Sequence, residues 1–190
     1  LNIKKNIAIN IIDLDDTAPE INPPLEFAAE ENQSSIGQIT ATDTDTDDNE
    51  ITYSISGSEI LISSETGVLT FQEEPDFETK NEYNASVTAT DGTNSSTEEI
   101  LVQITNINDN SPVFTSGATF SAAENQTAIG TVTASDADGD TITYSISGSE
   151  ITINSSTGVL TFVNAPDYET KSTYTATVTA SDGTNSTTQS

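Results

Sequence analysis

The 190-residue sequence predicts an all-β chain of two tandem, seven-strand Greek-key β-sandwiches, and three observations lead to this fold class. One series of short motifs occurs twice: the residues around Glu31 recur at Glu124, and those around Tyr53 recur at Tyr144. Apolar and polar residues alternate with a period of two, and no segment keeps a helical period over three turns. Turn dipeptides with glycine recur about every 8–12 residues.

The expected strands follow from this alternation along the chain. In the first copy, residues 51–55 and 83–89 place apolar side chains at every second position, and residues 142–146 and 174–180 repeat both patterns in the second copy. Threonine, valine, isoleucine and tyrosine dominate these segments, which suits a pleated, half-buried surface. Asp-Gly and Thr-Gly turns separate the segments, so each copy is predicted to fold as two packed antiparallel sheets.

The two ends of the chain indicate repeats that are cut out of phase. Residues 98–112 read EEILVQITNINDNSP, a last strand and its linker, and residues 5–19 read KNIAINIIDLDDTAP at the same place in the pattern. We therefore expect residues 1–17 to be the last strand and linker of a preceding repeat, with its strand detached. Residues 18–110 are then one repeat, and residues 111–190 are a second repeat that lacks its last strand.

The composition excludes several classes of function. The sequence has 31 acidic and 4 basic side chains and a formal net charge of −27, which argues against nucleic acid and anionic membrane surfaces as partners. Cysteine and histidine are absent, so disulfides, the usual zinc and copper ligands and the commonest general base are missing. The remaining oxygen donors select calcium. No apolar stretch is long enough for membrane insertion.

Short acidic motifs occur in the same order in both copies, although each one alone is common in turns. They are Glu31-Asn32, Asp43-Thr44-Asp45, Asp76-Phe77-Glu78, Asp91-Gly92 and the linker 106–112, then Glu124-Asn125, Asp136-Ala137-Asp138, Asp167-Tyr168-Glu169 and Asp182-Gly183. As an ordered series they resemble the motifs of the cadherin repeat, over nearly the whole chain. The resemblance implies a cadherin-like (immunoglobulin-like) sandwich that binds calcium and is not an enzyme.

The resemblance further implies that these groups meet at the junction between repeats and hold up to three calcium ions. Carried over by position, the expected ligands are Glu31, Asp76 and Glu78 of the first repeat, Asn108, Asp109 and the carbonyl of Asn110 in the linker, and Asp136, Asp138 and Asp182 of the second repeat. Carboxylates held together repel one another, and no basic residue of these motifs neutralises them. A divalent cation with six to eight oxygen ligands would do so.

The resemblance also implies a half-site at each end of the chain. The expected N-terminal ligands are Asp13, Asp15 and Asp16 with Asp43, Asp45 and Asp91, and the C-terminal ones are Glu124, Asp167 and Glu169. Phe77 and Tyr168 stand where the family has arginine, and Asn106 stands where it has aspartate. The chain has no tryptophan, so the tryptophan-anchored strand exchange of vertebrate classical cadherins is not expected.

These features predict an extracellular calcium-binding structural repeat, acting as a calcium-stiffened stalk or spacer of a cell-surface adhesin. The Thr- and Asn-rich, Cys-free composition is similar to that of cadherin-like arrays in large bacterial surface proteins. The alternative is a head-to-tail filament, in which residues 1–12 complete the open sheet edge of a neighbouring copy's second repeat. A glycan-binding module is a further alternative. The expected partners are calcium and either neighbouring repeats or other copies of the chain.

Overall fold

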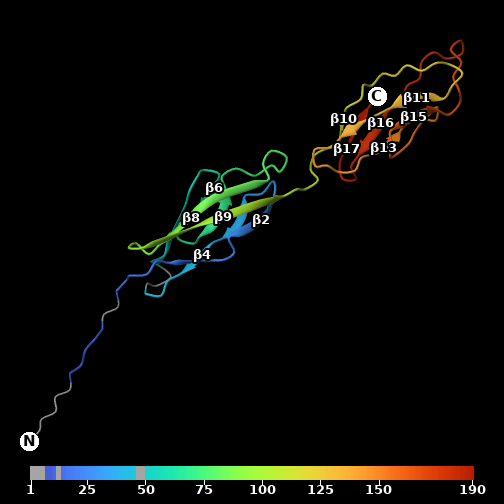
Figure 1. Cartoon of the computed structure of the whole chain (residues 1–190). Helices are drawn as coiled ribbons and strands as arrows, with labels where there is room; N and C mark the ends of the chain where they lie inside the picture. The colour runs from blue at the N-terminus through green and yellow to red at the C-terminus, as the bar shows by residue number, and fades with distance from the viewer. Residues whose placement is uncertain (1–6, 12–13, 46–49) are drawn as a thin grey trace, which may run out of the picture. The chain divides into compact units, whose positions relative to one another are not determined.

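A computed structural model describes residues 7–11, 14–45 and 50–190 (Figure 1). The chain divides into two compact units, 1–105 and 106–190. All regular elements in the described ranges are β-strands, which confirms the predicted all-β class. No helix long and apolar enough to cross a membrane is present in those ranges.

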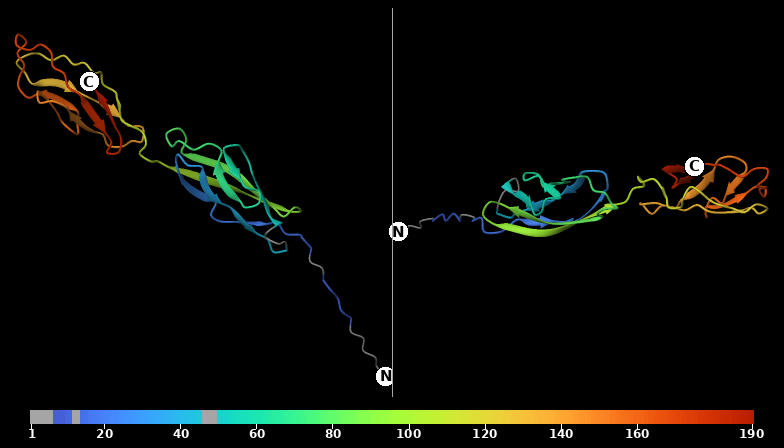
Figure 2. Two further views of the ribbon diagram at one scale, coloured as in Figure 1. Left: turned by 180° about the vertical axis from the view of Figure 1, so that it is seen from behind. Right: turned by 90° about the horizontal axis from the view of Figure 1, so that it is seen from above.

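The first unit is a sandwich of a four-stranded and a three-stranded sheet, with a small two-stranded sheet at one end. The four-stranded sheet has the order β2-β9-β8-β5, the three-stranded sheet β3-β7-β6, and β1 pairs with β4. The two layers face each other in the right-hand view of Figure 2. The strands are β1 (Glu20–Asn22), β2 (Glu26–Glu30), β3 (Ser35–Gln38), β4 (Thr40–Thr42), β5 (Thr52–Ile55), β6 (Ile60–Ile62), β7 (Val68–Phe71), β8 (Glu82–Thr90) and β9 (Ser95–Thr105).

Two of the seven expected strands are interrupted, so nine short elements form. Pro23 and Pro24 separate β1 from β2, because proline has no N–H for a ladder hydrogen bond. Between β3 and β4, the N–H of Ile39 leaves the ladder and donates to the carbonyl of Gly67 at 2.9 Å. The expectation that both sheets are purely antiparallel is wrong in one place, since β2 pairs with β9 in parallel, from Glu26 opposite Leu101 to Glu30 opposite Thr105.

The second unit repeats this plan with shorter strands. Its sheets have the orders β13-β16-β17, β11-β15-β14 and β10-β12. The strands are β10 (Val113–Phe114), β11 (Ala128–Thr131), β12 (Ala134–Ser135), β13 (Thr143–Ile146), β14 (Ile151–Ile153), β15 (Val159–Phe162), β16 (Val178–Ser181) and β17 (Ser186–Gln189). β17 corresponds to the beginning of β9, so the first four residues of the strand that we expected to be missing are in place and pair with β16.

The cores of the two units differ in how completely they are closed. The first core buries 14 hydrophobic side chains, including Leu69, Val87 and Val102, whereas the second unit buries only Val132, Leu160, Val178 and Ala180. The equivalents of several buried residues of the first unit are only half-buried in the second. Phe162, for example, is half-buried although its counterpart Phe71 is 3% exposed. The second sandwich is therefore open on one side.

A glycine in the same tight turn of each unit is required by both its conformation and its surroundings. Gly67 and Gly158 have φ of +69° and +68°, in the left-handed region. A Cβ at either position would lie 2.1 Å from a backbone oxygen, that of Ile39 or of Val132. This close approach holds the turn before β7 or β15 against the neighbouring strand.

Candidate metal sites

Acidic side chains gather at the N-terminal end of the first unit, where the linker segment 14–17 meets two loops. The carboxylate of Asp45 accepts hydrogen bonds from the backbone N–H groups of Asp16 and Thr17 at 2.9 and 3.0 Å. The hydroxyl of Thr17 lies 2.8 Å from Asp45 Oδ1 and 3.2 Å from Asp43 Oδ1. In the second loop, Asp91 Oδ1 accepts the N–H groups of Thr93 and Asn94, both at 2.6 Å. Asp13 lies outside the described residues.

The N-terminal end of the second unit repeats this arrangement with the linker 106–110. Asp138 Oδ2 accepts the backbone N–H of Asn110 at 2.9 Å, as Asp45 does with Thr17, and Asp138 Oδ1 accepts the Asn110 side-chain amide at 2.9 Å. Asp136 Oδ1 accepts the N–H of Asp138 at 3.1 Å. Asp182 Oδ1 accepts the N–H groups of Thr184 and Asn185 at 2.7 and 2.6 Å. Each carboxylate is therefore oriented by backbone donors through one of its oxygens.

The second oxygen of three of these carboxylates makes no hydrogen bond. Oδ2 of Asp91, Asp136 and Asp182 is shielded from solvent and has no donor among the described residues. A buried carboxylate oxygen without a partner is costly. Oδ2 lacks a hydrogen-bond donor in both units, at Asp91 and at its counterpart Asp182. This unsatisfied oxygen is therefore a feature of the repeat and not a local irregularity of one unit. A bound cation would satisfy it.

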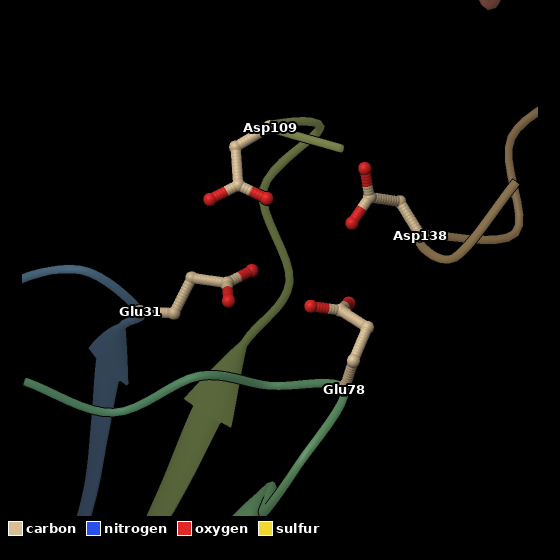
Figure 3. Close-up of side chains that lie close together, drawn as sticks. All are labelled: Glu31, Glu78, Asp109 and Asp138. Atoms are coloured by element: carbon tan, nitrogen blue, oxygen red, sulfur yellow. The ribbon is translucent and has the colours of Figure 1, made fainter. Parts of the chain in front are cut away.

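Acidic residues also gather at the opposite end of each unit. In the first unit, Glu31 follows β2, and Glu78 lies on the loop after β7 (Figure 3). Their carboxylate oxygens come within 4.8 Å of each other. Glu31 is 3% exposed and accepts the N–H of Phe77 at 2.9 Å. Asp76 caps this loop by accepting the N–H of Thr79 at 3.2 Å and its hydroxyl at 2.9 Å.

The second unit has the same acidic end, made of Glu124, Asp167 and Glu169, whose carboxylate oxygens lie within 4.8 Å of one another. Glu124 accepts the N–H of Tyr168 at 3.0 Å, as Glu31 does with Phe77. Aromatic residues at the position of the family's arginine therefore leave this contact intact, because the backbone makes it.

The Glu-Asn turn has a backbone reason for its asparagine. Asn32 and Asn125 have φ of 59° and 60°, a left-handed conformation that asparagine tolerates better than most residues. Their N–H groups donate to the carbonyls of Pro75 and Pro166 at 3.0 and 2.9 Å. These bonds hold the glutamate beside the loop that carries the neighbouring aspartate.

Hydrogen bonds to the ionised carboxylates lower the pKa of several of these residues. The pKa of Asp45 lies well below its ordinary value of 3.8, chiefly because the N–H of Asp16 donates to it. The pKa of Asp91 is lowered by the N–H of Asn94, and that of Asp167 by the hydroxyl of Thr170. Burial opposes ionisation of Asp182, but the N–H groups of Asn185 and Thr184 outweigh it and lower the pKa. These four carboxylates are charged at neutral pH.

The described lysines do not neutralise the acidic ends. Lys80 forms an ion pair with Glu59 at 2.6 Å and lies over the ring of Tyr83, and Lys171 does the same with Glu150 and Tyr174. Both ion pairs involve glutamates outside the acidic sets. The all-oxygen donors of the acidic sets fit calcium.

The structure adds residues that the sequence patterns did not single out as part of the sites. The side-chain amide of Asn185 donates to Asn108 Oδ1 at 2.8 Å and to the carbonyl of Asn110 at 3.2 Å, and so ties the linker to the Asp182 turn. Asn94 reaches Asp15 Oδ1 in the same way at 3.2 Å. In the sequence, the repeated Asp-Gly-Thr-Asn tetrapeptide could have indicated these two asparagines. Asp140 also joins Asp136 and Asp138, with carboxylate oxygens within 4.8 Å.

Comparisons with known proteins agree on one family. The family model of the cadherin domain matches residues 25–105 and 118–190. Human protocadherin Fat 1 is 37% identical over 93% of the chain, and mouse cadherin EGF LAG seven-pass G-type receptor 1 is 30% identical over 93%. The chain spans only 4% and 6% of the length of these relatives.

Solved structures show the same fold. The structure of mouse cadherin-23 EC22-24 matches with a TM-score of 0.77 at 24% identity, over 92% of this chain and 65% of that one. The structure of human protocadherin-24 EC1-2 matches with a TM-score of 0.73 at 20% identity, over 91% of this chain and 92% of that one.

Proposed function

The chain belongs to the cadherin domain family, and we propose that its two repeats form a calcium-stiffened spacer in the extracellular part of a longer protein. Cadherin repeats are structural adhesion modules and not enzymes, and calcium binding is typical of them. The spacer role, the ions and their ligands in this chain are our proposal. The observation that carries it is the set of shielded carboxylate oxygens of Asp91, Asp136 and Asp182, which have no donor among the described residues.

We assign the ligands by unit. The first unit offers Glu31, Asp76 and Glu78 after β2 and β7, and the second offers Asp136, Asp138 and Asp182, with Asn108, Asp109 and the carbonyl of Asn110 from the linker. Hydrogen bonds inside the second unit support this assignment, because they orient Asp136 and Asp182 through one oxygen each and hold Asn108 beside Asn185. Asp138 accepts hydrogen bonds from Asn110 through both of its oxygens, which places it beside the linker. The N-terminal set of Asp13, Asp15, Asp16, Asp43, Asp45 and Asp91 and the C-terminal set of Glu124, Asp167 and Glu169 would serve neighbouring repeats.

Calcium would act here by removing freedom from the linker. Without a cation, carboxylates brought together repel one another and favour a loose junction. If an ion takes oxygen ligands from both repeats and from the linker, the repeats can move apart only when the binding energy of the ion is lost. Extracellular modules bind calcium at about 10⁻⁴–10⁻³ M, so the spacer would be stiff outside the cell and loose where calcium is scarce.

The test is small-angle scattering of the whole chain in millimolar calcium and in chelator. We expect a longer and narrower distribution of maximum dimension in calcium. Asp109→Ala or Asp138→Ala should remove much of that change. The matched control is Glu65→Gln, which removes one charge from an exposed turn outside the acidic sets. Equal dimensions for the Asp138→Ala variant and the parent chain in calcium would refute the proposal.

A further inference from the structure

The linker 106–112 is held on the second unit by hydrogen bonds whose donors and acceptors all belong to the chain. The chain divides into its two units before Asn106, so the linker is part of the second unit. The side-chain amide of Asn106 donates to the backbone carbonyl of Asp138 at 3.0 Å. Further along the linker, the carboxylate of Asp138 accepts the backbone N–H and the side-chain amide of Asn110, both at 2.9 Å. One residue of the second unit therefore contacts the linker at two separate points.

Asn185 holds the middle of the linker. Its side-chain amide donates to Asn108 Oδ1 at 2.8 Å and to the carbonyl of Asn110 at 3.2 Å. Asn185 is itself fixed, because its backbone N–H donates to Asp182 Oδ1 at 2.6 Å. Asn185 lies 77 residues along the chain from Asn108. The linker is therefore positioned by the folded second unit and not by its own local conformation.

The first unit holds the segment 14–17 by contacts of the same kinds. Asp45 accepts the backbone N–H and the hydroxyl of Thr17 at 3.0 and 2.8 Å. The side-chain amide of Asn94 donates to Asp15 Oδ1 at 3.2 Å. These two linker side chains differ from their counterparts in the second linker, which are both asparagine, and equivalent contacts still form. Attachment of a linker to the repeat that follows it is therefore a feature of the repeat.

Asn106 adds a contact that the family's aspartate could not make at this position. A carboxylate has no N–H and would face the carbonyl of Asp138 oxygen to oxygen, whereas an amide donates to it. The observed hydrogen bond therefore depends on the amide nitrogen of Asn106. It attaches the linker to the second unit from its first residue onward.

We propose that Asn106 and Asn185 hold the linker on the second unit in the absence of calcium, so that the chain pivots between Thr105 and Asn106 when calcium is scarce. The linker and second-unit ligands are then in place before an ion arrives, and calcium binding has to order the joint at the end of β9. Both asparagines are positioning residues, since neither is among the ligands that we assign. The inference rests on the proposed spacer function, because such a joint matters only if calcium stiffens it.

The first experiment measures residual dipolar couplings and heteronuclear NOE values of the backbone amides, on the 190-residue chain in chelator. We expect the couplings of residues 108–110 to fit the alignment of the second unit and not that of the first, with the lowest NOE values of the junction at residues 105–106. Two separate alignments with low NOE values across 108–110 would overturn this inference and leave the proposed function standing. A single alignment for the whole chain in chelator would overturn both, because no joint would be left for calcium to stiffen.

The second experiment repeats these measurements in chelator on Asn106→Asp, which keeps Oδ1 and replaces the donating amide nitrogen by oxygen. Low NOE values should then extend to residues 106–107, while residues 108–110 stay ordered through Asn185. The matched control is Asn154→Asp, which adds the same charge to the second unit and keeps the side-chain oxygen that accepts the N–H groups of the following turn. An NOE profile of Asn106→Asp equal to that of the parent, or a change spread evenly over the second unit, overturns the proposed role of Asn106.

The third experiment asks whether the attached linker helps calcium to bind. Isothermal titration with calcium should give a dissociation constant about 2- to 10-fold higher for Asn185→Ala than for the parent, because the ion must then order a free linker. Thr184→Ala shortens an exposed side chain in the same turn and leaves the Asn185 amide in place, so it should bind like the parent. An equal dissociation constant for Asn185→Ala and the parent, with residues 108–110 freed in chelator, overturns the inference that the attached linker prepares the site.

Discussion

Replacement of Asp136 by asparagine isolates the oxygen that we assign to calcium. Asp136 Oδ1 accepts the N–H groups of Asp138 and Asp140 at 3.1 and 3.4 Å, and asparagine keeps an oxygen for both bonds. The substitution changes only Oδ2, which is shielded and has no donor among the described residues, into an amide nitrogen that cannot bind a cation. The turn should survive and the metal ligand should be lost.

The expected magnitude follows from linkage between binding and unfolding. At about 2 mM calcium and a dissociation constant of about 10⁻⁴–10⁻³ M, each ion adds about 0.7–1.8 kcal/mol to the free energy of unfolding. For a domain of this size, that raises the melting temperature by about 4–8 °C per kcal/mol. Asp136→Asn should lose most of this calcium-dependent increment and keep the parent's stability in chelator.

The assay is thermal unfolding followed by circular dichroism and tyrosine fluorescence, in calcium and in chelator, for the parent, Asp136→Asn and the control Glu65→Gln. For each protein, the calcium-induced shift in melting temperature is measured, and the shift of Asp136→Asn is compared with that of the parent. A full calcium shift in Asp136→Asn would refute the assignment of this oxygen as a ligand. An equal loss of stability in calcium and in chelator would show that Asp136 only supports the turn.

Three further perturbations test other parts of the structure. Asn185→Ala removes hydrogen bonds to Asn108 and Asn110 and should lower the free energy of unfolding by about 1–2 kcal/mol, even in chelator; unchanged amide exchange at 108–110 would contradict this. Gly158→Ala places a Cβ against Val132 and should cost about 2 kcal/mol or more in urea unfolding, whereas Gly148→Ala, where a Cβ meets open space, should cost about 1 kcal/mol. The lowered aspartate pKa values mean that their contribution to stability is complete above the unfolded value of 3.8 and is lost as the pH falls below it. Acid unfolding in chelator should therefore begin below about pH 4. Stability that already falls near pH 6 would contradict the lowered pKa values of these aspartates.

The sequence predicted the fold well because its two copies check each other. A period of two at Val87 and Ala89 has the same phase at Val178 and Ala180, and all four side chains are buried in β8 or β16. The strand predicted over residues 174–180 forms only from Val178 onward. The parallel pairing of β2 with β9 could not be predicted in this way. Alternation shows which face of a strand is buried, but it carries no information about the direction of its neighbour.

The acidic residues show the same division between what a pattern reveals and what it leaves open. The order of the motifs indicated which aspartates belong together at the end of one unit, and Asp43 and Asp45 do meet the linker at Thr17. It did not reveal that Asn94 and Asn185 tie the linker in place, because an asparagine after an Asp-Gly turn is also an ordinary turn residue. The contribution of Asn185 depends on a contact 77 residues away.

The parallel pair β2 and β9 has a mechanical consequence. Tension along the chain pulls β2 from its N-terminal end and β9 from its C-terminal end, and the two strands run in the same direction. The pair is therefore loaded in shear, and the five residue pairs from Glu26–Leu101 to Glu30–Thr105 must yield together. A hairpin pulled at its open end yields one pair at a time and needs less force.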